Sequence, residues 1–133
     1  MNETITKEEL PTSFGSFNPI GHMMVGLPDL AKAQALTEAL RASGLPGEDL
    51  VNFTPRESVA KFEAMTENAS DAEAFGYELR MQLRYLEHAR RGWYFLLVKV
   101  QDGEGASRAA EIARSHGATL AVYYRMLVLQ EMI

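Results

Sequence analysis

Short apolar runs alternate with longer segments of helical periodicity along most of this chain. Residues 22–27 (HMMVGL) form an apolar run that predicts a strand. From Leu30 onward, apolar residues recur at helical spacing, and Asp29 suits the N-cap because its carboxylate can accept from the free amides of the first turn. Gly44 predicts the end of this helix, since glycine adopts a positive φ at little cost. A second strand is expected over residues 49–54.

The same arrangement returns near the C-terminus. Residues 93–100 (WYFLLVKV) are almost continuously apolar, which is typical of a strand covered on both faces. Residues 106–113 have alanine at helical spacing. Because alanine side chains are small, this face would let the helix lie close to a sheet. Gly117 predicts the end of that helix. Residues 119–126 are expected to form the last strand, running on through Leu129.

Between these halves lie residues 55–92, too long a segment for a hairpin or for a structureless loop. Its pattern predicts two helices, over residues 56–66 and 71–91, with a capping box at the start of the second formed by Ser70 and Glu73.

The second of these helices has two apolar stripes. They consist of Phe75, Leu79, Leu83 and Leu86, and of Tyr77, Met81, Tyr85 and His88. One stripe is needed to pack on the domain. The other either widens the buried face or forms a partner surface or the wall of a pocket.

Two strand–helix–strand halves predict an α+β domain with a ferredoxin-like split βαβ arrangement. We expect a four-stranded antiparallel sheet with a helical insertion between the second and third strands. Residues 23–27 and 95–100 would then be the central strands. The predicted organisation is an irregular N-terminal arm over residues 1–21, followed by a single domain over residues 22–133.

Composition narrows the range of functions only modestly. The chain has 133 residues, of which 47% are hydrophobic and 23% charged, as in an ordinary soluble domain. It has no cysteine, which excludes disulfides and thiolate metal sites and fits the cytoplasm. We see no secretory signal and no apolar run near the roughly 20 residues of a membrane span. The net charge of −5 argues against nucleic acid as the main partner.

Residues 15–22 (GSFNPIGH) resemble the phosphate-binding stretch of the adenylyltransferases that make nicotinate or pantetheine dinucleotides. Two residues of that stretch are missing here, including its first histidine. No apolar strand precedes Gly15, and a strand rather than a helix is expected after His22. We therefore interpret the segment as a loop that leads into the first strand.

The remaining candidates for chemistry are scattered. His22, His88 and His116 have no metal-ligand spacing, and we expect neither a metal nor a cofactor. The predicted long helix is locally basic and has interleaved aromatic residues, which would suit a single-stranded nucleic acid or an anionic ligand. Its basic residues are Arg80, Arg84, Arg90 and Arg91. The interpretation we prefer is that these arginines favour the helix dipole and the acidic surroundings.

Both halves of the chain resemble the bacterial heat-induced, general-stress-protein family. The similarity covers residues 24–27 with 39–44, and residues 97–100 with 109–118 (AAEIARSHGA). The middle of the chain departs from that family, whose members often have a glycine-rich stretch there. The resemblance implies a small cytoplasmic, stress-associated protein, and it supplies no catalytic residues.

We therefore predict a non-enzymatic, homodimeric cytoplasmic protein. The apolar C-terminal segment 126–133 is expected to be buried under the insertion helices or across a dimer interface. The alternative is a small-ligand-binding or sensor domain with its pocket between the sheet and the helix 71–91. Its candidate ligand-binding residues are Tyr77, Arg84, Tyr85, His88, Trp93 and Tyr123. An enzyme of this architecture would need clustered polar groups such as His22, His88 and Arg84.

Overall fold

The computed structural model describes residues 20–68, 76–125 and 128–133, and five strands form one antiparallel sheet in it. Their order across the sheet is β2-β3-β1-β4-β5. The strands are β1 (His22–Leu27), β2 (Leu50–Phe53), β3 (Tyr94–Lys99), β4 (Leu120–Arg125) and β5 (Val128–Glu131). The strand predicted over residues 93–100 is thus interior, between β1 and β2, as expected.

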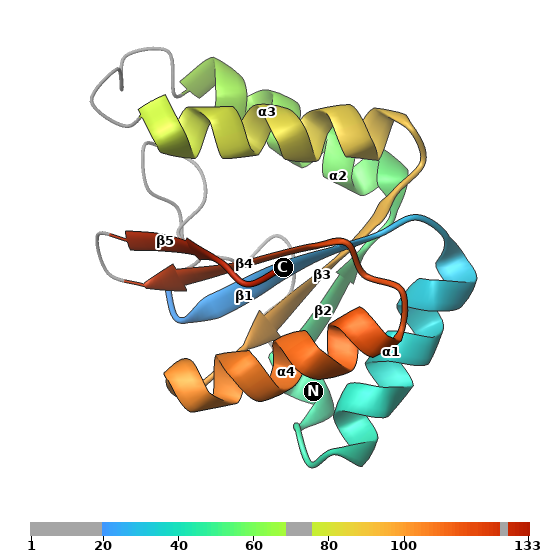
Figure 1. Cartoon of the computed structure of the whole chain (residues 1–133). Coiled ribbons are helices and arrows are strands. Elements are labelled where there is room, and N and C mark those ends of the chain that lie inside the picture. Colours follow the sequence, from blue (N-terminus) through green and yellow to red (C-terminus); the bar gives the residue numbers. More distant parts are fainter. Residues whose placement is uncertain (1–19, 69–75, 126–127) are drawn as a thin grey trace.

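Four α-helices in the described residues cover both faces of this sheet (Figure 1). They are α1 (Leu30–Ala42), α2 (Pro55–Asn68), α3 (Gly76–Arg90) and α4 (Gly103–Ser115), with a short 3-10 turn, η2 (Gly47–Asp49), before β2. Helices α1 and α4 lie on one face, and the insertion helices α2 and α3 lie on the other. The α+β class and the helical insertion are therefore confirmed.

The local signals at the helix ends hold in the structure. The Asp29 carboxylate accepts from the amide of Lys32 at 2.8 Å. Gly44 has a φ of +113°, and the amide of Leu45 donates back to the carbonyl of Leu40 at 3.2 Å. Gly117 likewise has a positive φ, +92°, directly after α4.

The core has two halves, one on each side of the sheet. Because successive side chains of a strand point to opposite faces, Met23 packs toward α1 and α4, whereas Met24 packs toward α2 and α3. On the first side, α4 contributes only small buried residues, namely Ala106, Ala109, Ala110 and Ala113. The alanine face of α4 is therefore the face that packs in this half of the core.

The number of strands predicted from the sequence was wrong by one. Residues 119–129 do not continue as one strand, because β5 turns back and pairs antiparallel with β4, with Val128 opposite Arg125. The last two residues, Met132 and Ile133, pack against the α1/α4 half of the core. Of the two predicted positions for the C-terminal segment, burial under the insertion helices does not apply to Met132 and Ile133, which pack on the opposite half of the core. Burial across a dimer interface stays a prediction.

The insertion helices use a wide buried face of α3. Met81 and Tyr85 of the tyrosine-containing stripe are buried, and so is Leu86 of the other stripe. Leu83 of that other stripe is 47% exposed. The predicted break and capping box at residues 68–73 fall mostly outside the described residues, as does Phe75. The predicted N-terminal arm is described only from residue 20 onward.

Candidate functional site

Tyr85, a candidate pocket residue, is fully buried in the α2/α3 half of the core. Its ring centroid lies 5.2 Å from that of Phe62 and 5.6 Å from that of Phe95. Its hydroxyl forms a hydrogen bond with the hydroxyl of Tyr124. In the described part of the interface between α3 and the sheet, aromatic side chains therefore occupy the space where a pocket was predicted.

Tyr123 does not join the other candidate residues. It packs on the α1/α4 side of the sheet, whereas its neighbour Tyr124 points toward α3 and meets Tyr85. A shift of one residue along a strand moves a side chain to the other face. The predicted site required Tyr123 on the face that Tyr124 occupies.

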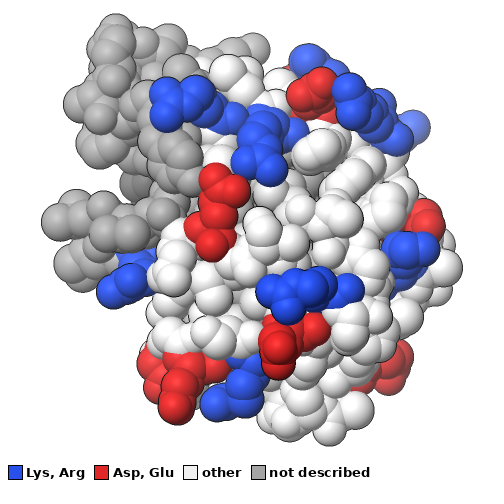
Figure 2. All heavy atoms as spheres, in the orientation of Figure 1, with Lys and Arg blue, Asp and Glu red and all other residues white. Residues whose placement is uncertain are grey.

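The candidate residues on the exposed side of α3 are mostly engaged with acidic partners. Arg84 lies 3.6 Å from Glu131 of β5, and its side chain is 46% exposed. Arg90, the last residue of α3, forms an ion pair with Glu63 at 2.8 Å, and Arg91, directly after the helix, forms one with Glu87 at 2.9 Å. Acidic side chains accompany basic ones over the face shown in Figure 2. This pairing favours the interpretation of these arginines as surface charges. Tyr77 belongs to α3, but its side chain falls outside the described residues.

Two of the candidate residues, His88 and Trp93, are in direct contact. Their rings stack at a centroid distance of 4.2 Å and an interplanar angle of 18°. The Nδ1 atom of His88 is buried and has no hydrogen-bond partner among the residues that the structure describes. Burial, together with the nearby guanidinium groups of Arg84 and Arg91, lowers the pKa of His88 below its ordinary value, against a smaller opposite effect of Glu87.

We expect this histidine to make stability depend on pH. Since its pKa is lower in the folded state, the unfolded chain binds a proton first as the pH falls, and stability decreases from about pH 6.5 downward. Urea unfolding between pH 7.5 and 5.5, followed by circular dichroism, measures this loss. His88→Phe preserves the stacking on Trp93 and removes the titration, so its stability should fall less over that interval. Equal losses in both proteins would contradict the expectation.

The polar residues that an enzyme would need do not lie together in the structure. His22 begins β1 with its Nδ1 3.2 Å from the carbonyl of Ile20, and His116 follows α4 with its Nδ1 2.9 Å from the carbonyl of Ile112. Within residues 20–68, 76–125 and 128–133, no three histidine, aspartate or glutamate side chains converge to hold a metal ion.

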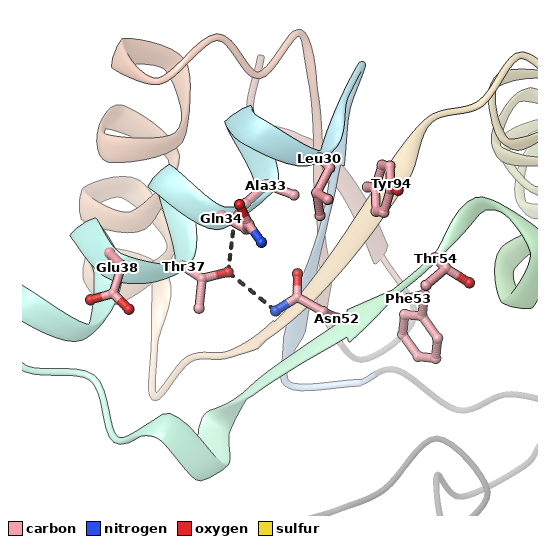
Figure 3. A pocket seen from close by; sticks show the side chains of 9 residues that line it. All are labelled: Leu30, Ala33, Gln34, Thr37, Glu38, Asn52, Phe53, Thr54 and Tyr94. Atoms are coloured by element: carbon pink, nitrogen blue, oxygen red, sulfur yellow. Dashed lines mark hydrogen bonds between the residues drawn. The ribbon is translucent and has the colours of Figure 1, made fainter.

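A groove of about 400 Å³ lies elsewhere, between α1 and the edge strand β2 (Figure 3). The groove is lined by residues of α1 and by residues of β2 together with the following Thr54. Tyr94 of β3 lies at one end. The lining residues are Leu30, Ala33, Gln34, Thr37, Glu38, Asn52, Phe53, Thr54 and Tyr94. Leu30, the first residue of α1, is 47% exposed here although it continues the apolar pattern of that helix.

Some polar side chains of the groove remain able to form hydrogen bonds with a ligand. The side-chain amide of Asn52 donates to Thr37 Oγ1 at 3.2 Å, and that hydroxyl donates to the carbonyl of Ala33 at 2.9 Å. Within the described part of the chain, Asn52 Oδ1 and the amide of Gln34 have no partner. Glu38, the charged member of the lining, is paired with Arg41 at 3.1 Å. The groove therefore offers apolar surface and neutral polar groups.

Sequence reasoning missed this groove. Leu30 and Ala33 were assigned to the apolar face of a helix and residues 52–54 to a strand, but neither assignment tells where α1 lies over the sheet. The one available signal was Asn52, a polar residue within an otherwise apolar strand. Its side chain is exposed because α1 leaves that part of β2 uncovered.

Among the described residues, no helix combines the length and the apolar character that crossing a membrane requires. Comparison with family models, with curated proteins and with solved structures gives no match for this chain.

Proposed function

We propose that this protein is a non-enzymatic, ferredoxin-like binding domain that takes a small ligand in the groove between α1 and β2. The strand order β2-β3-β1-β4 and the placement of α1 and α4 on one face support the ferredoxin-like assignment. On this proposal β5 and the α2–α3 pair are additions to that core. The insertion then covers the face that a plain two-layer sheet would leave open.

The groove is the observation on which the binding function depends. Its volume of about 400 Å³ falls at the lower end of the range typical of small-molecule sites, roughly 300–1,000 Å³. Leu30 and Tyr94 supply apolar walls, while Gln34 and Asn52 supply amide groups that could orient a ligand. Since the carboxylate of Glu38 is already paired, we expect a neutral and largely apolar molecule with one or two polar groups.

A thermal-shift screen with neutral aromatic and aliphatic amides tests this proposal. At a free concentration one hundred times its Kd, a ligand stabilises the protein by about 2.7 kcal/mol, a rise in Tm of roughly 8 °C for a chain of this size. Gln34→Trp places a large side chain in the groove and should abolish the shift. Ala35→Trp, on an exposed position of the same helix outside the groove, is the matched control. Shifts that persist in Gln34→Trp would place the ligand elsewhere.

We also propose that the protein acts as a homodimer in the cytoplasm. Helices cover both faces of the sheet, so a second copy would associate through a sheet edge or through the outer surfaces of the helices. Light scattering over a range of protein concentrations measures the mass directly. The association with a stress response stays a prediction from the resemblance.

A further inference from the structure

We propose that the groove between α1 and β2 selects a secondary amide attached to an aromatic ring, and that Asn52 recognises the N–H of this amide. This inference rests on the proposed binding function and names the class of ligand. The amide lies across the groove, between the side chains of Asn52 and Gln34. The aromatic ring lies at the end of the groove that Leu30 and Tyr94 form.

A chain of two hydrogen bonds fixes the orientation of the Asn52 side chain (Figure 3). Thr37 donates its hydroxyl proton to the carbonyl of Ala33 at 2.9 Å, so its oxygen can only accept from Asn52. The amide nitrogen of Asn52 therefore faces Thr37, at a distance of 3.2 Å. Oδ1 of Asn52 has no partner among the described residues, and it is left to accept from an N–H of the ligand.

Gln34 faces Asn52 from the helical wall of the groove. In Figure 3 the two side-chain amides point toward one another, and within the described residues no hydrogen bond joins them. The side chain of Gln34 is exposed on α1, so it can turn its NH2 group toward a carbonyl of the ligand. A ligand between the two walls thus meets an acceptor on the strand and a donor on the helix.

A secondary amide matches this pair of groups. In its trans form the N–H and the C=O point in opposite directions, so one of them reaches each wall. An alcohol has its donor and its acceptor on a single oxygen, and an ester or a ketone has no N–H for Oδ1 of Asn52. A charged ligand is disfavoured, because Glu38, the charged residue of the lining, is already paired with Arg41 at 3.1 Å.

The apolar end of the groove indicates what the amide carries. Leu30 is 47% exposed and is one of three large apolar side chains left exposed in the described residues. Tyr94 lies at the same end, because its strand partner Leu27 comes three residues before Leu30. An aromatic ring at this end covers Leu30 and packs beside the ring of Tyr94, which adds apolar area and an aromatic pair. The ligand is therefore an aryl group joined to an amide.

N-Methylbenzamide and methyl benzoate are matched probes, because the ester has nearly the same shape and lacks the N–H donor. NMR titration of the full chain, labelled with nitrogen-15, measures the Kd of each probe. For probes of about ten non-hydrogen atoms we expect Kd values in the millimolar range. The amide should bind about three- to tenfold more tightly than the ester.

Four variants test which side chain makes this distinction. Asn52→Leu removes the acceptor, so the ester should then bind at least as tightly as the amide. Gln34→Leu should weaken both probes about two- to fivefold and keep the preference for the amide, since both probes have a carbonyl. Thr37→Val removes the hydroxyl that orients Asn52 and should reduce the preference. Lys99→Leu, at an exposed strand position outside the groove, is the matched control and should change neither Kd.

The outcomes separate the class of ligand from the binding function. Equal binding of both probes retains the groove as a binding site and overturns recognition of the amide N–H. A preference for the amide that survives Asn52→Leu overturns the role of Asn52. If neither probe binds, the aryl amide is overturned as the ligand. The proposed function then fails too only if the thermal-shift screen finds no ligand whose effect Gln34→Trp abolishes.

Discussion

Replacement of Phe95 by alanine is expected to lower the free energy of unfolding by about 3–5 kcal/mol, the largest effect that we predict for a single substitution. Phe95 is fully buried in β3, and its ring lies 5.1 Å from Phe62 in an edge-to-face arrangement. The substitution removes a ring that packs against both α2 and α3. Since a domain of this size is stable by roughly 5–15 kcal/mol, the loss is a substantial part of the total.

Urea unfolding followed by circular dichroism measures this change. Leu83→Ala is the control, because it also shortens a large apolar side chain, but at a position on α3 that is 47% exposed. It should cost less than about 1 kcal/mol. A similar cost for both substitutions would show that Phe95 does not occupy the centre of a packed cluster, and would reopen the space between α3 and the sheet as a ligand pocket.

The elements that sequence reasoning located correctly are those with local signals. The first helix begins at an aspartate that accepts from a backbone amide and ends at a glycine with positive φ, and both features are visible in the sequence. The strand HMMVGL was predicted with the bounds that the structure has. Such features depend on neighbouring residues, so no knowledge of the tertiary arrangement was needed.

Local signals could not predict to which face of the sheet a strand residue points. β3 and β4 are apolar on both faces because helices cover both, and their sequences show no alternation from which the two sides could be separated. Tyr123 was therefore placed beside Tyr85, whereas Tyr124 makes that contact. The candidate pocket depended on this assignment.

The hairpin between β4 and β5 was missed for a related reason. Residues 119–129 contain no glycine, proline, asparagine or aspartate that would indicate a reversal of the chain. An apolar run of this kind is compatible with one long strand or with two short ones. Long-range packing, with Met132 and Ile133 against the α1/α4 half of the core, is what distinguishes them.

Replacement of Ala109 by leucine is expected to destabilise the protein by about 1–3 kcal/mol or more, because the alanine face of α4 sets its distance from the sheet. Ala109 is 3% exposed, and the residues one turn before and after it, Ala106 and Ala113, are fully buried. Because Ala109 is buried, three additional carbon atoms have to displace neighbouring atoms of the core. We expect α4 to move away from β4, which would reduce its contacts along the helix.

The matched control is Ser107→Leu, on the exposed side of the same helix. Leucine has a higher helix propensity than serine, so this variant should be neutral or slightly more stable, by at most about 0.5 kcal/mol. Urea unfolding of the two variants thus compares the same new side chain on opposite faces of α4. Equal stability would mean that the helix does not lie close to the sheet, and the alanine pattern would then have no structural role. A loss confined to Ala109→Leu would show that spacing between helix and sheet, rather than helix propensity, is what these alanines determine.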